Sequence, residues 1–187
     1  MGFFDHVPRP TEPLPAEPEQ PDWDRPEAVL PGIIPQSHVL ARTDDVALAI
    51  DGLRAYPNGF MFGLVVVFRR SPRGRHSDVM ASLHHLSPDE PLGDEVLRLG
   101  VRFPDGRTAT NLDRPFAHLG AGRPMLVARG GGGGGRRWDQ DFWVHPLPPP
   151  GALAFVCEWP VHGIEETMLT VDAADIRVAA SRAVPLF

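Results

Sequence analysis

The frequency of proline and glycine is the feature that most constrains the fold of this chain. The 187 residues include 22 Pro and 19 Gly, together nearly double the background of about 12% for these two residues. Such a composition argues against a helical bundle. The length is that of one ordinary domain with a single hydrophobic core.

The N-terminal region differs from the rest of the chain in composition. Residues 1–36 hold nine prolines, seven acids and two arginines, whereas residues 37–187 hold 16 arginines against 17 acids. Most of the net charge of −6 therefore lies in a proline-rich segment with little apolar surface to bury. We expect a disordered or polyproline-like acidic arm over 1–36 and one domain over 37–187. Phe3, Phe4 and Trp23 are the residues of this arm that could dock on the domain or on a partner.

The segment after the arm carries a β-hairpin pattern. Val46, Leu48 and Ile50 alternate with smaller or polar residues, which indicates a half-buried strand. Asn58-Gly59 then predicts a hairpin turn, since both residues tolerate positive φ. The returning strand, 60–70, is apolar on both faces, so we expect it to lie centrally in a sheet that is covered on both sides.

Further strands are predicted over 96–103, 107–111, 125–129, 137–145, 153–159 and 166–171. Residues 71–93, with one helical turn at 78–85, and 112–123 are expected to be loops, and the six-glycine run 130–135 a flexible loop tip. One helix is predicted at 173–183, with Asp172 as its N-cap and Asp175 in its first turn. The connections are short, which predicts an all-β, antiparallel two-sheet β-sandwich; a barrel-like curved sheet is the alternative.

The strand 137–145 carries the densest group of polar and aromatic residues. Its alternation places Arg137, Asp139, Asp141, Trp143 and His145 on one face. Two carboxylates beside an aromatic ring and an imidazole are typical of a carbohydrate or small-ligand site. The competing interpretation is that Asp139 and Asp141 pair with arginines of a neighbouring strand.

Several classes of site are disfavoured by the residues present. All 18 basic residues are arginine, which excludes a Schiff-base or Walker-type lysine. The lone Cys157 lies on the face of Phe155 and Trp159 and is expected to be a buried core thiol. The eight histidines match no zinc signature, so no metal or other cofactor is expected. A nucleic-acid site at Arg129, Arg136 and Arg137 is disfavoured by the acidic balance. The absence of a signal peptide or long apolar run predicts a soluble, cytoplasmic chain without a membrane partner.

Residues 155–160 (FVCEWP), Gly163-Ile164 and the preceding segment 138–151 resemble a family of uncharacterised β-rich proteins from GC-rich bacteria. The likeness extends over roughly positions 30–187, and it implies a standalone domain without transferring any catalytic residue.

The sequence holds no complete catalytic constellation, so we expect a non-enzymatic β-sandwich that engages a protein partner or a second copy of itself. The acidic arm or the loops 71–93, 112–123 and 130–135 would make the contact. The alternative is a small-ligand or carbohydrate-binding or carbohydrate-active protein that uses Asp139, Asp141, Trp143 and His145.

Overall fold

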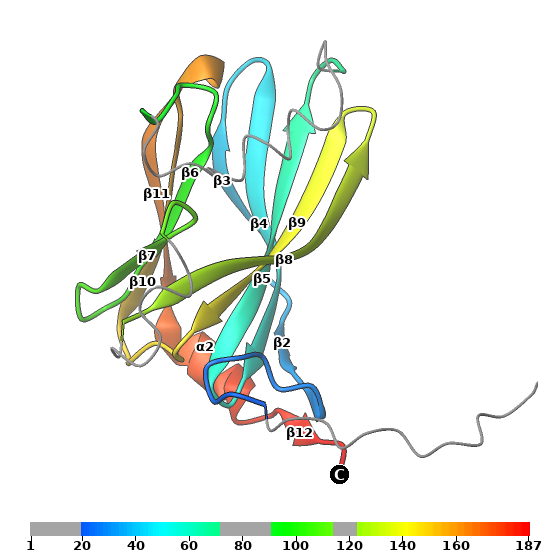
Figure 1. Ribbon diagram of the computed structural model, residues 1–187, viewed down its shortest axis with the longest axis vertical. Coiled ribbons are helices and arrows are strands. Elements are labelled where there is room, and N and C mark those ends of the chain that lie inside the picture. Colours follow the sequence, from blue (N-terminus) through cyan, green and yellow to red (C-terminus); the bar gives the residue numbers. More distant parts are fainter. Residues whose placement is uncertain (1–19, 72–90, 114–122) are drawn as a thin grey trace, which may run out of the picture.

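Two antiparallel sheets face each other in the computed structural model, which describes residues 20–71, 91–113 and 123–187 (Figure 1). The larger sheet has the order β2-β4-β5-β9-β8, with β3 also paired to β4; the smaller has the order β11-β10-β6-β7. A third, two-stranded sheet joins β1 to β12. The described strands form a β-sandwich and do not close into a barrel, as the alternation of apolar residues predicts.

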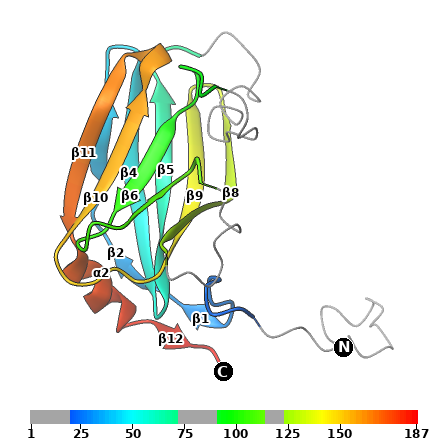
Figure 2. The ribbon, with the colours of Figure 1, turned by 60° about the vertical axis from the view of Figure 1, so that its left-hand side comes forward.

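The larger sheet consists of β2 (Gly32–Ile34), β3 (His38–Arg42), β4 (Val46–Tyr56), β5 (Gly59–Phe68), β8 (Met125–Gly134) and β9 (Arg137–His145). The smaller sheet consists of β6 (Arg98–Arg102), β7 (Thr108–Thr110), β10 (Ala152–Trp159) and β11 (Ile164–Asp172). The remaining elements are β1 (Val29–Leu30), β12 (Val184–Pro185), the 3-10 helix η1 (Pro160–His162) and the helix α2 (Ala173–Ala180). Figure 2 shows α2 at one end of the two sheets.

Aromatic side chains join the two sheets. Phe62 of β5 packs edge-to-face on Phe155 of β10, with ring centroids 4.9 Å apart, and stacks on Phe142 of β9 at 5.5 Å. All three side chains are fully buried. Each buried ring of this size stabilises the fold by about 2–3 kcal/mol relative to an exposed one. The opposed apolar faces of β5 and β10 therefore hold the sandwich together.

The β4–β5 hairpin is confirmed, but its turn lies one residue earlier than predicted. Pro57 and Asn58 form the turn, and Gly59 is the first residue of β5, paired with Tyr56. Neither Asn58 nor Gly59 adopts a positive φ. Glycine is required at 59 for another reason: a Cβ there would lie 2.6 Å from the Trp143 ring. The close contact with Trp143 of β9 therefore explains why residue 59, which the local pattern assigned to the turn, is a glycine.

The C-terminal helix begins where the sequence predicts. The Asp172 side chain accepts a hydrogen bond from the Ala174 amide at 2.8 Å and so caps the first turn. The helix ends at Ala180 rather than at 183, and the chain continues into β12, which pairs with β1.

The prediction of a disordered arm over 1–36 is wrong for residues 20–36. Val29–Leu30 and Gly32–Ile34 form strands. Trp23 and Val29 pack on a second apolar cluster, made of buried Tyr56, Met61, Met125, Val127 and Trp143 on the outer side of the larger sheet. The prediction used the average composition of all 36 residues, in which a few apolar side chains such as Trp23 and Val29 carry little weight. Residues 1–19, including Phe3 and Phe4, lie outside the described residues, as do most of the predicted loops 71–93 and 112–123.

No helix among the described residues is long and apolar enough to span a membrane.

Truncation of Phe155 to alanine should lower the free energy of unfolding by about 3–5 kcal/mol, because it leaves a cavity between the sheets. The matched control is Val39→Ala on β3, where the side chain is 61% exposed and the expected change is within about 0.5 kcal/mol. Chemical denaturation of both variants measures the difference. Equal losses would contradict the assignment of Phe155 to the centre of the core.

Candidate functional site

The strand β9 has the bounds and the alternation that the sequence predicts. Trp138, Gln140, Phe142 and Val144 are buried on the side of the smaller sheet. Arg137, Asp139, Asp141, Trp143 and His145 point to the other side of the larger sheet.

The four candidate ligand-binding residues on that face each have a different partner. Asp139 accepts a hydrogen bond from Nε of Arg137 at 2.8 Å, and Oδ1 of Asp141 lies 2.7 Å from Nη2 of Arg54 on β4. Trp143 is fully buried, and its Nε1 donates to the Trp23 carbonyl at 2.9 Å.

His145 completes the set: its Nδ1 lies 2.9 Å from the Asn58 carbonyl oxygen, and partial burial lowers its pKa. Both aspartates pair with arginines, but not with arginines of an adjacent strand, because Arg137 lies on β9 itself and Arg54 lies on β4, beyond β5. The aromatic ring that a sugar site would need, Trp143, is buried.

Cys157 adds no reactive group to this face. Cys157 is buried in the core, as predicted, and burial raises the pKa of its thiol to about 11. Such a thiol stays protonated at neutral pH and is a poor nucleophile. Among the described residues, no three His, Cys, Asp or Glu side chains are grouped closely enough to hold a metal ion.

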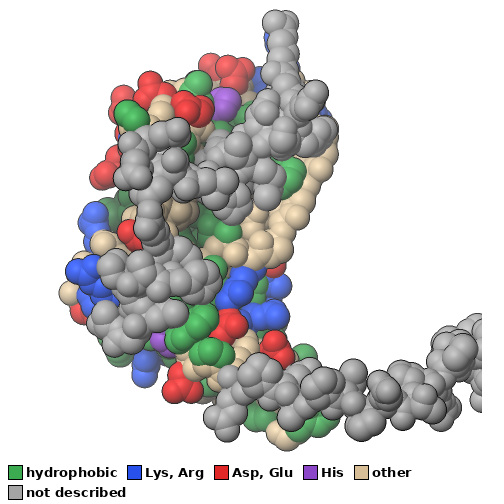
Figure 3. All heavy atoms as spheres, in the orientation of Figure 1, with side chains coloured by type: hydrophobic (Ala, Val, Ile, Leu, Met, Phe, Trp, Pro, Cys, Tyr) green, Lys and Arg blue, Asp and Glu red, His purple; other side chains and the backbone are tan. Residues whose placement is uncertain are grey.

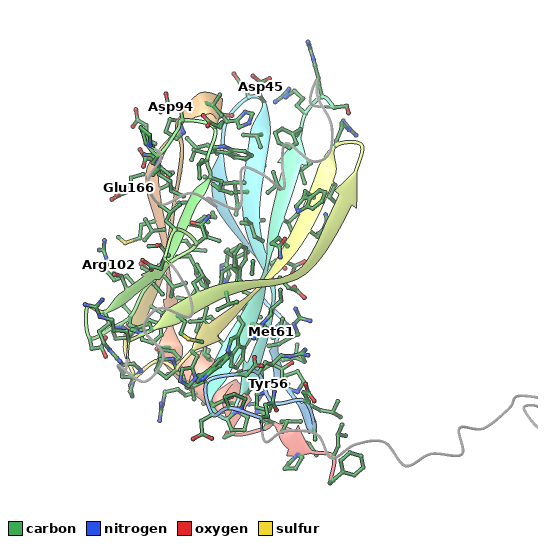
Figure 4. The ribbon with its side chains drawn as sticks, viewed as in Figure 1. Asp45, Tyr56, Met61, Asp94, Arg102 and Glu166 are labelled. Atoms are coloured by element: carbon green, nitrogen blue, oxygen red, sulfur yellow. The ribbon has the colours of Figure 1, made fainter. Side chains whose placement is uncertain are left out.

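A groove of about 210 Å³ lies on the outer side of the smaller sheet. Gly100 and Val156 are paired residues in its floor, and Arg98 and Arg102 flank Gly100 along β6. Nη1 of Arg98 bonds Oε2 of Glu158 at 2.6 Å, but Nε of Arg98 is buried without a hydrogen-bond partner. Figure 4 shows Arg102 and Glu166 on this outer side. The groove was not predicted from the sequence, where its only signal is a glycine inside an alternating strand.

The glycine run forms a strand, which corrects the prediction of a flexible loop tip over 130–135. Residues Gly131 to Gly134 pair with Gln140 to Arg137, and only Gly135 and Arg136 make the turn. A Cβ at Gly131 would lie 2.4 Å from Oε1 of Gln140, and one at Gly133 would lie 2.6 Å from Cε3 of Trp138. Two large inward side chains of β9 thus occupy the space that side chains of β8 would need.

Gln140 also holds the start of the run in place. Its Nε2 donates to the carbonyls of Arg129 and Gly130 at 2.8 and 3.3 Å, where the pairing of β8 with β9 is interrupted by a bulge. Gln140 is the only buried polar residue among those described. Its amide therefore supports the bulge that starts the glycine strand.

The other edge of β8 is unpaired by any described strand. The two-residue turn closes on the pair Gly134 and Arg137, and such closing pairs are hydrogen-bonded. By alternation, Gly131 and Gly133 direct their N–H and C=O groups away from β9. Residues 130–134 are all exposed, and Figure 3 shows a band of backbone along the side where β8 runs in Figure 1.

This edge lacks most of the features that normally protect a sheet edge. No proline and no charged residue occurs within 130–134, and among the described residues the bulge at its start is the one protective feature of this edge. A Cβ at Gly130 or Gly132 would meet no atom of the described residues within 4 Å. Two of the nearby arginines are already paired, Arg129 with Asp24 and Arg137 with Asp139, which further disfavours a phosphate-binding role.

Comparison with protein-family models, with curated proteins and with solved structures finds no match to this chain. The candidate sites therefore rest on their own geometry.

Gly133→Ala should destabilise the protein by about 1–3 kcal/mol, because its Cβ would lie 2.4 Å from the Arg137 carbonyl oxygen. Gly132→Ala is the matched control in the same strand, and we expect no loss there, since its Cβ meets open space. Thermal unfolding of the two variants measures the contrast. If both lose the same stability, the strand assignment of the run is incorrect.

Proposed function

We propose that this protein is a non-enzymatic interaction module that binds an extended polypeptide segment by strand addition along β8. The observation that carries the proposal is the exposed edge of Gly130–Gly134, whose outward N–H and C=O groups no described strand uses. In strand addition, main-chain hydrogen bonds provide the affinity and neighbouring side chains provide the selectivity.

The side-chain-free edge supports this function in a second way. Glycine inside a strand is unfavourable and commonly marks a place where another backbone approaches closely. Contacts among the described residues account for Gly131 and Gly133, but no such contact accounts for Gly130 or Gly132. An approaching strand would use the open space beside these two residues.

Of the contact regions expected from the sequence, the run 130–135 is thus the best supported, in the form of a strand edge rather than a loop. Of the two sites at which Trp23 could dock, the domain or a partner, it occupies the domain, where it packs on the Trp143 cluster and its carbonyl accepts from Trp143 Nε1.

Peptides selected from a random display library on the immobilised protein test the proposal. We expect a selected peptide to slow amide hydrogen exchange at Gly131 and Gly133 by about tenfold or more, with a smaller effect at Gly132, because only alternate amides face the edge. Gly132→Lys should weaken binding by guarding the edge, whereas Thr170→Lys on β11 should not. Protection confined to another strand or to loops would refute strand addition.

A second candidate function, small-ligand binding, is favoured by the groove over Gly100 rather than by the Asp139 face. The partnerless, buried Nε of Arg98 is a donor that a carboxylate or sugar oxygen in the groove could satisfy.

Thermal-shift screening with monosaccharides and small carboxylates tests this candidate. We expect a stabilising compound to raise the melting temperature of the native protein and to lose its effect in Arg98→Gln, but to retain it in Arg107→Gln, whose side chain is outside the groove. The absence of any shift would remove the candidate.

A further inference from the structure

We propose that the segment that pairs with β8 is β8 of a second copy, so that the protein forms a two-fold symmetric dimer through its glycine edge. This inference rests on the proposed strand-addition function and names the partner. An antiparallel pair formed by a strand with itself is generated by a two-fold axis, and each copy presents the same patch.

The backbone groups of the run fit such a pair in one register. The N–H and C=O groups of Gly131 and Gly133 point away from β9, so each of these residues must lie opposite a residue of the second copy whose backbone groups also point toward the interface. A two-fold axis at Gly132 places Gly131 of one copy opposite Gly133 of the other, twice. This register forms about four inter-chain hydrogen bonds, and a shift by one residue aligns outward with inward groups and loses them.

The charges near the run do not oppose this register. Gly135 and Arg136 lie in the turn to β9, beyond the residues of β8 that would pair. Arg129 is already neutralised by its ion pair with Asp24.

Side chains do not obstruct the pairing. Gly132 would face Gly132 of the second copy, and its missing side chain points into open space. A strand that pairs with this edge must have an unguarded edge of its own, and residues 130–134 of β8 have one, with neither proline nor charge. The contact is one strand per copy, smaller than a standard interface, so we expect a weak dimer whose population rises with protein concentration.

Charge placed at the axis tests the dimer. Gly132→Asp and Gly132→Lys each set like charges opposite each other across the axis, and both variants should be monomeric by sedimentation equilibrium at concentrations where the native chain dimerises. An equimolar mixture of the two should recover dimers, because Asp then faces Lys. Thr170→Asp, on the exposed edge strand β11, is the control and should dimerise like the native chain.

Each outcome decides the inference. Unchanged melting temperatures of the variants at low concentration exclude misfolding as the cause of dissociation. A native chain that stays monomeric up to roughly 1 mM overturns the dimer, but protection of Gly131 and Gly133 by selected peptides would leave strand addition standing. A dimer that survives both Gly132 substitutions also overturns it and assigns the interface elsewhere, first to the exposed apolar residues Leu30, Val184 and Leu186 at the β1–β12 end.

Discussion

The contact between Phe62 and Phe155 determines which surfaces the rest of the molecule can offer. These rings lie on different sheets, 4.9 Å apart, and they fix the inward faces of β5 and β10. Because side chains alternate along a strand, the outward face of every neighbouring strand is then fixed as well. On β9 this alternation places Phe142 inside and both Asp141 and Trp143 outside.

An outward tryptophan would expose a large apolar surface, and the chain covers it with its own N-terminal segment. Trp23 and Val29 pack on the Trp143 cluster, the Trp143 indole donates to the Trp23 carbonyl, and Asn58 donates to the carbonyls of Asp22 and Asp24. Pairing of β1 with β12 then ties this segment to the C-terminus. Trp143, on the face that the sequence suggested as a ligand site, is therefore used to hold residues 20–30, whereas Asp139 and Asp141 on the same face pair with arginines.

Local patterns were sufficient for the parts of the fold that depend on alternation. They predicted the sandwich, the bounds of β9, the central position of β5 and the cap at Asp172. They failed where the conformation depends on a residue far away in the sequence. Gly59 is a glycine because Trp143 occupies the space of a side chain. The run 131–133 can lie against β9 as a strand because it has no side chains on the side that Gln140 and Trp138 fill. The groove was missed because Gly100 becomes a floor only when β7 and β10 lie beside β6.

The glycines of the run fall into two groups, those that packing within the described protein requires and those that it does not. Glycine in a strand costs about 0.5–1 kcal/mol per residue relative to alanine. At Gly131 and Gly133 a substitution to alanine would remove this cost but would add a larger steric clash with β9. Packing inside the protein therefore explains why these two residues are glycine. At Gly130 and Gly132 alanine would meet no atom of residues 20–71, 91–113 or 123–187 within 4 Å, and no contact in this part of the chain offsets the cost. Gly130 and Gly132 lie beside Gly131 and Gly133, whose N–H and C=O groups face the edge of the sheet and are used by no described strand. A contact between chains explains the pattern because two backbones pair most closely where neither strand carries side chains.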